Sequence, residues 1–172
     1  MFYGCESLKL ADFTNFDTSQ VISMNSMFSF CVEIESINLS GFNIQNLEDV
    51  FDMFLNCKAL VSLDISNFKT LKVTTMHRLF AYCENLKELN LASFDTSKVV
   101  DMQFMFYGCK SLTSLNLSNF KTPNVIYIDA MFYDCISLAF PDISNFKTTK
   151  VTNLARMFYN CHNLTLIGCI KS

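Results

Sequence analysis

The sequence predicts an α/β repeat solenoid of about six and a half coils, each 26 residues long. Two observations predict it. Apolar residues alternate in one short segment of every coil and return every three or four positions in the next. Seven of the eight cysteines also recur every 26 residues without an insertion, at Cys5, Cys31, Cys57, Cys83, Cys109, Cys135 and Cys161. A single coil could not bury its apolar edge, so we expect the coils to stack along one axis.

The first element of each coil is a short strand. In the third coil, Leu60-x-x-Leu63-x-Ile65 has the spacing of a leucine-rich repeat, in which the alternating pair brackets the strand. Equivalent strands are expected to centre on Asn38, Asn90, Asn116 and Asp142. The sequence therefore predicts a leucine-rich-repeat horseshoe with parallel strands on its concave face.

The second element follows each strand after a short connection. Its apolar residues lie three, three and one positions apart, which fits one face of a short α-helical or 3₁₀ segment on the convex face; in the third coil they are Val73, Met76, Leu79 and Phe80. A threonine that could cap this segment precedes it at Thr18, Thr70, Thr96, Thr122 and Thr148. The second coil carries Ile44 there and lacks the cap.

Inward residues are expected to form ladders along the stack. Phenylalanine recurs in two rows, which predicts two aromatic spines, Phe28, Phe54, Phe80, Phe106, Phe132 and Phe158, and Phe42, Phe68, Phe94, Phe120 and Phe146. Aligned cysteines have parallel Cβ vectors, which suit disulfide geometry poorly, so we expect buried free thiols. Cys169 departs from the period, and we expect it to lie in the core as well.

Composition narrows the class of function. The net charge of −3, a pI near 5.3 and only 17% charged residues disfavour a nucleic-acid surface. No apolar run of 18 residues occurs, and no charged region precedes an apolar one at the N-terminus, so neither a transmembrane segment nor a signal peptide is predicted. We expect one domain over residues 1–172. Met1 aligns with Met27 inside the repeat, so we expect this domain to belong to a longer chain.

Nothing in the sequence predicts an enzyme. His77 and His162 lie nearly three coils apart, and neither has a nucleophile or second ligand at a suitable spacing. Phosphate-binding and nucleophile-elbow motifs are absent from the sequence. We therefore predict no catalytic residue, no cofactor and no metal site.

Two sets of residues near the strands could contact a partner. Asp12, Asn38, Asp64, Asn90, Asn116 and Asp142 form an acidic and amide ladder, which either binds a cation or carbohydrate or bonds only to itself and the backbone. Positions flanking the strands vary between coils, as binding positions often do. From both sets we predict concave-face contacts at Lys9, Glu35, Asn38, Asp64, Lys87, Glu88, Asn90, Asn116, Phe140 and Asp142.

A tyrosine row follows the repeat phenylalanine, at Tyr3, Tyr107, Tyr133 and Tyr159, with Phe30 and Tyr82 one position later. Such a row either anchors an interface or packs along the stack.

The pattern L-x-x-L-x-L-S-x-F-x-T-x-x-V-x-x-M-x-x-M-F-x-x-C, seen from Leu112 to Cys135, resembles that of the BspA-like leucine-rich-repeat surface proteins of bacteria and some parasitic protists. Pro141, Leu79 and Ile128 depart from the pattern. The resemblance covers nearly the whole chain and implies a non-enzymatic module, at the cell surface or secreted, that adheres to a protein such as a host matrix or cell-surface protein. The alternative is an intracellular, cytoplasmic scaffold or recognition protein, which the reduced thiols and the absent signal peptide would suit.

Overall fold

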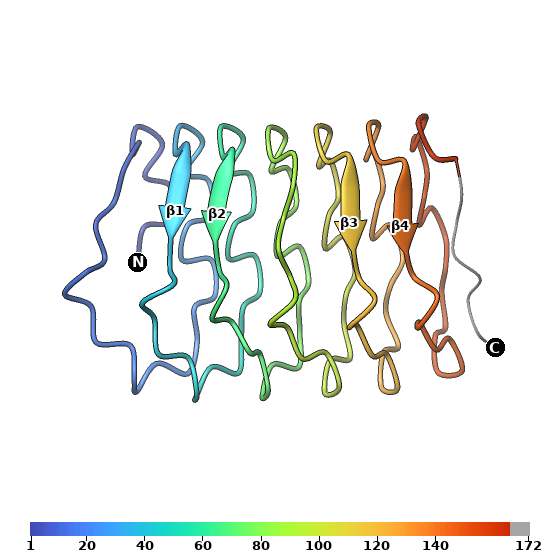
Figure 1. The fold of residues 1–172 in the computed structure, drawn as a ribbon, viewed down its shortest axis with the longest axis horizontal. Coiled ribbons are helices and arrows are strands. Elements are labelled where there is room, and N and C mark those ends of the chain that lie inside the picture. The colour runs from blue at the N-terminus through green and yellow to red at the C-terminus, as the bar shows by residue number, and fades with distance from the viewer. Residues whose placement is uncertain (166–172) are drawn as a thin grey trace.

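The computed structural model describes residues 1–165, which wind into a stack of coils. Figure 1 shows the coils standing side by side along the long axis of the molecule, in chain order from blue to red. Strands lie on one side of the coils and turns on another, so we name two faces by their content. The strand face comprises residues 35–38, 61–64, 87–90, 113–116 and 139–142, and the turn face comprises residues 23–31, 49–57, 75–83, 101–109, 127–135 and 153–161.

Four short strands lie on the strand face: β1 (Ser36–Asn38), β2 (Ser62–Asp64), β3 (Ser114–Asn116) and β4 (Phe140–Asp142). β1 pairs with β2 and β3 pairs with β4, both in parallel, so two separate sheets of two strands result. The strands centre one residue before the predicted position. The strand expected around Asn90 is wrong, because residues 87–90 form no strand. Pro141, which has no backbone N–H, lies in β4 at the edge of its sheet.

The predicted helical segments are also wrong, since no helix occurs within residues 1–165. Each turn segment instead contains two successive turns with a left-handed residue in third place, the arrangement of a type II turn. In the second coil, Asp52 (φ 54°) and Asn56 (φ 61°) take these places. The turns close through Met53 N–H to Val50 O (3.2 Å) and Cys57 N–H to Phe54 O (3.2 Å).

The same backbone explains why the apolar spacing looked helical. The first and last residues of each turn point inward, so buried residues return at intervals of three and one, as on a helix. The amides of the left-handed residues donate to the next coil, as Asp52 does to His77 O (3.1 Å) and Asn56 to Ala81 O (2.8 Å). Parallel bridges also join the successive coils, through Ser23, Asp49, Thr75, Asp101, Tyr127 and Asn153.

The threonine row links coils and caps no helix. Thr96 Oγ1 donates to Lys121 O (2.7 Å) and accepts from Lys121 N–H (2.8 Å). Thr70 bonds Asp95 in the same two ways. The hydroxyl does accept an N–H, as predicted, but from a residue 25 positions later rather than from its own segment. Ile44 cannot make this link, and a crevice of about 510 Å³ opens beside it, between the second and third coils.

The first phenylalanine spine is confirmed. Its rings stack from Phe28 to Phe158 with centroids 5.2 to 5.7 Å apart and planes within 13° of parallel. The second spine is confirmed only in part. Phe94, Phe120 and Phe146 stack at 6.4 and 6.5 Å, whereas Phe68 has no stacked ring partner among the described residues.

The periodic cysteines are free thiols, as predicted. The predicted burial is confirmed from Cys31 to Cys135, whereas Cys161 is half-buried and Cys5, in the first coil, is exposed. Each from Cys31 to Cys161 donates its S–H to the carbonyl of a spine-row phenylalanine 29 residues earlier, over 3.0 to 3.3 Å. Burial raises the thiol pKa, to about 12 at Cys109 and about 11 at Cys161. Cys169 lies outside the described residues.

Candidate functional site

The break in the strand face forms a groove. No backbone hydrogen bond joins residues 61–64 to residues 87–90 in the described chain, although these segments belong to neighbouring coils. A groove of about 440 Å³ opens there, between β2 and β3. It is lined by Val61, Ser62, Leu63, Glu88, Leu89, Asn90, Ser114 and Asn116.

The groove combines apolar and polar groups. Val61 is 52% exposed, an unusual setting for a branched apolar side chain, and Leu63 and Leu89 are half-buried beside it. Glu88, Asn90 and Asn116 are exposed and supply a carboxylate and two amides. An apolar patch edged by polar groups is the usual composition of a protein contact surface.

Three of the ten predicted contact residues, Glu88, Asn90 and Asn116, meet in this groove. Asp64 ends β2 and Lys87 precedes Glu88, so both lie next to it. The remaining predicted contacts lie on other coils. Glu35, Asn38, Phe140 and Asp142 are on the strand face, and Lys9 precedes its first segment. Lys9 forms an ion pair with Glu33, at 3.9 Å between Nζ and Oε2, and both side chains are exposed.

The acidic and amide ladder bonds to its own backbone. Asn38 Oδ1 accepts from Ser40 N–H (2.9 Å) and from Ser40 Oγ (2.7 Å). The same pair of bonds holds Asn116 to Ser118 and Asp142 to Ser144. Hydrogen bonds from Ser66 and Ser144 lower the pKa of Asp64 and Asp142, respectively. The structure therefore favours the structural role of the ladder over a cation or carbohydrate site, because one oxygen of each side chain is already engaged in an Asx turn.

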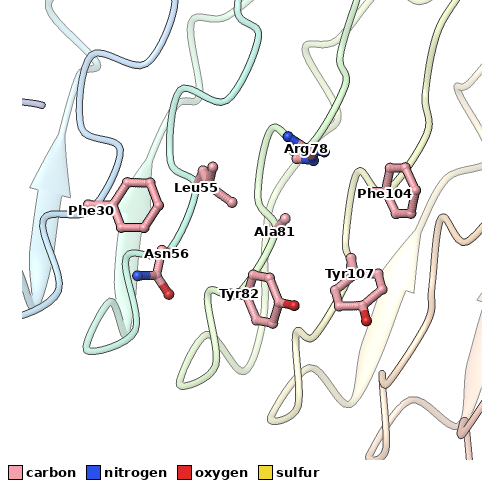
Figure 2. A pocket seen from close by; sticks show the side chains of 8 residues that line it. All are labelled: Phe30, Leu55, Asn56, Arg78, Ala81, Tyr82, Phe104 and Tyr107. Carbon is pink, nitrogen blue, oxygen red and sulfur yellow. The ribbon is translucent and has the colours of Figure 1, made fainter. Parts of the chain in front are cut away.

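A second cavity, which the sequence did not indicate, lies on the turn face. It measures about 390 Å³ and is lined by Phe30, Leu55, Asn56, Arg78, Ala81, Tyr82, Phe104 and Tyr107. Figure 2 shows these side chains coming from four neighbouring coils. The guanidinium carbon of Arg78 lies 5.6 Å from the centroid of the Phe104 ring, in a cation–π contact.

A cluster of ionisable side chains lies beside this cavity. His77 Nδ1 is 3.3 Å from Asp101 Oδ2, and the imidazole stacks on the Phe51 ring at 5.1 Å between centroids. Arg78 lies 3.9 Å from Asp52 Oδ2. Burial raises the pKa of Asp52, and the charges of Arg78 and His77 oppose that rise. No group of three or more His, Cys, Asp or Glu side chains within residues 1–165 is arranged to hold a metal ion.

The tyrosine row packs along the stack. Tyr133 stacks on Tyr107 and on Tyr159, with centroids 4.6 and 4.7 Å apart. Partial burial and a hydrogen bond with Tyr82 raise the pKa of Tyr107 to about 12. The stacked geometry favours ladder packing for Tyr107, Tyr133 and Tyr159, whereas Phe30 and Tyr82 lie in the pocket described above.

These features define a class of protein: a repeat solenoid, with leucine-rich-repeat spacing, that carries surface grooves. The chain belongs to the family described as Mycoplasma protein of unknown function, DUF285, which matches residues 1–89 and 76–166. None of the described residues form a helix long and apolar enough to cross a membrane. No curated protein matches the chain.

Several solved structures resemble it, and two of them are leucine-rich proteins. One is a leucine-rich repeat protein from Bacteroides ovatus, with 16% identity and a TM-score of 0.30, which aligns with 97% of this chain. The other is a leucine rich cell surface protein from Faecalibacterium prausnitzii, with 14% identity and a TM-score of 0.33 over 97% of this chain. The chain spans 56% of the length of the first and 74% of the second.

Proposed function

We propose that this chain is a non-enzymatic interaction module of a cell-surface or secreted protein, and that it adheres to a protein partner through its strand face. The observation that carries the proposal is the groove at the break in the sheet. There, exposed Val61 lies beside Glu88, Asn90 and Asn116, and these polar side chains can fix the orientation of a partner. The BspA-like resemblance supports the location and the adhesive role.

Binding at this face would depend on a large contact area and on the fixed spacing of the coils. The stack fixes the spacing of the groove relative to β1 and β4, so a partner would meet several weak sites already in place. A rigid array loses little conformational entropy on binding, which favours modest contacts distributed over several coils. Charged side chains of the strand face would favour partners of complementary charge; they are Lys87, Glu88 and Glu35.

The alternative is an intracellular scaffold or recognition protein. The free thiols do not separate the two locations. Each periodic thiol from Cys31 onward is already bonded to a carbonyl, and burial raises the pKa of those thiols, so they would resist oxidation in either compartment.

The test is binding of the purified chain to immobilised extracellular matrix proteins and to intact cells. A variant with Glu35→Lys, Lys87→Glu and Glu88→Lys should bind at least about tenfold more weakly, a loss of ~1.4 kcal/mol. The control is Glu48→Lys, at an exposed residue outside the strand face, because it changes the net charge by the same amount as the test variant. Equal binding by both variants would contradict the strand face as the contact. Absence of saturable binding by the folded protein would favour the intracellular scaffold.

A further inference from the structure

Two backbone positions in each coil of the turn face are left-handed. The first row is Gly4, Phe30, Asn56, Tyr82, Gly108, Asp134 and Asn160, and the second is Ser26, Asp52, Arg78, Phe104, Ala130 and Arg156. Glycine adopts this conformation freely and Asn or Asp tolerate it, whereas large side chains are disfavoured there. Eight of these thirteen positions accordingly carry Gly, Ala, Ser, Asn or Asp.

Large side chains at the left-handed positions gather in one place. Four of the five, Phe30, Arg78, Tyr82 and Phe104, line the turn-face pocket of Figure 2, and Arg156 is the fifth. Residues held in a disfavoured conformation cluster at functional sites, where the surrounding structure offsets their strain. We propose that this pocket is a second binding site, which takes an acidic peptide of a protein partner by enclosing an aromatic side chain and pairing the adjacent carboxylate with Arg78.

The side chains of the pocket are preorganised by contacts within the protein. The amides of its left-handed residues are fixed to the next coil, with Phe30 N–H donating to Leu55 O (2.7 Å) and Tyr82 N–H to Tyr107 O (2.6 Å). Gly108 lies directly against the Tyr82 ring, where an added Cβ would approach Cδ1 to 2.8 Å. Because these contacts hold the rings in place, a ligand would pay little to order them.

The walls of the pocket suit an aromatic side chain. The Tyr107 ring is inclined by 61° to Tyr82 and by 60° to Phe104, with centroids 5.1 and 5.8 Å away. Inclined rings offer edges and faces to a further ring, the arrangement that aromatic side chains prefer. Tyr82 and Phe30 are 38% and 37% exposed, so both remain accessible to a ligand.

The charge in the pocket suits a carboxylate. Arg78 is the charged member of the eight lining residues, and its side chain is 44% exposed. Its contact with Asp52 is long, at 3.9 Å, so the guanidinium keeps N–H groups for a second acceptor. A volume of about 390 Å³ is within the usual range for a ligand pocket. An aromatic residue next to Asp or Glu supplies both groups.

This inference does not depend on the proposed function, since the pocket and the strand-face groove share no residue. The first experiment titrates the full chain with acetyl-Gly-Phe-Asp-Gly-amide by NMR. Saturable binding is expected at about millimolar concentration, the range for a ligand of this size. The Asn peptide, without the carboxylate, and the Ala peptide, without the ring, should each bind at least fivefold more weakly. Equal binding of all three peptides would overturn the proposal, as would equal or tighter binding of free N-acetylphenylalanine.

The second experiment replaces the pocket residues with those that other coils carry in the same rows. Tyr82→Asn and Phe104→Ala should each weaken peptide binding at least tenfold. Tyr82→Asn should also leave the melting temperature unchanged or higher, because Asn tolerates the left-handed conformation. Arg78→Ser should remove the preference for Asp over Asn. Asp134→Asn, in the same row outside the pocket, is the matched control and should change neither property. Retained binding in Tyr82→Asn and Phe104→Ala, or a lower melting temperature in Tyr82→Asn, would overturn the proposal.

Discussion

The two faces of this solenoid are held together differently. On the strand face, pairing joins β1 to β2 and β3 to β4 but stops at residues 87–90. On the turn face, parallel bridges continue from Ser23 through every coil to Asn153. The face with regular strands is thus the interrupted one, and the face made of turns is the continuous one. Cohesion in this fold follows the hydrogen bonds between coils rather than the secondary structure within them.

The side chains follow the same division. Beneath the turn face lie the stacked phenylalanine spine and the thiol ladder, both almost fully buried. The strand face presents polar side chains that bond mainly to their own backbone, such as Asn38 and Asn116. A break on the strand face therefore costs few contacts between coils, which leaves that surface free to vary.

The largest expected difference in stability is between variants of the buried side chains beneath the two faces. Phe106 is fully buried and stacks on Phe80 and Phe132, so Phe106→Ala should lower the free energy of unfolding by about 3–5 kcal/mol. Leu89 is half-buried at the groove, and Leu89→Ala should cost under about 2 kcal/mol. Urea denaturation measures both values. Equal losses would contradict the greater cohesion of the turn side.

High pH should lower the stability of the protein through the buried thiols beneath the turn face. The pKa of Cys109 is about 12 in the folded chain, above its ordinary value of 9.0, so the unfolded state loses this proton first. The free energy of unfolding should therefore be unaffected below pH 9 and fall from pH 9 towards 12, by about 1.4 kcal/mol per pH unit for each such thiol. Urea denaturation across this range measures the slope.

Cys109→Ser is the control for the thiol prediction. Serine can keep the bond to Phe80 O but does not titrate in this range, so the fall above pH 9 should be shallower by one proton. An unchanged slope would show that Cys109 does not contribute to the alkaline instability.

The smallest effect is expected at the threonine links between neighbouring coils. The link of Thr96 joins two coils whose strand-face segments do not pair. Thr96→Val keeps the shape of the side chain but leaves Lys121 N–H and O without their partner, at a cost of about 1–3 kcal/mol. Thr148 has no such link within residues 1–165, so Thr148→Val should change stability by less than about 0.5 kcal/mol. Thermal unfolding compares the two variants. A loss at Thr148 as large as that at Thr96 would refute the linking role.

The repeat could be predicted from the sequence because, in a stack of equivalent coils, the buried residues recur at the interval of one coil. The 26-residue interval of the cysteines placed Phe28 to Phe158 in one row, and stacking followed from identical coils. Free thiols could be predicted for the same reason. The turns of the turn face were predicted as helical segments because Met76, Leu79 and Phe80 have spacings that a short helix and two successive turns share.

A usable signal for those turns was present but overlooked. Gly4, Asn56, Gly108, Asp134 and Asn160 occupy one repeat position, and such a composition is typical of left-handed backbone. The pocket could not be predicted from it, because Phe30 and Tyr82 contradict that composition. The missing strand at residues 87–90 could not be predicted from the sequence either, since Leu86, Leu89 and Leu91 keep the apolar pattern of the neighbouring strands.

The bonds between coils join each coil only to its neighbours and so act along the axis of the stack. A mechanical load applied to the two ends would pull these bonds in series and open the weakest boundary first. Each opened coil would release 26 residues, roughly 90 Å of extended chain, in place of a rise of about 4.8 Å. A solenoid built in this way would lengthen stepwise under tension and absorb work, coil by coil.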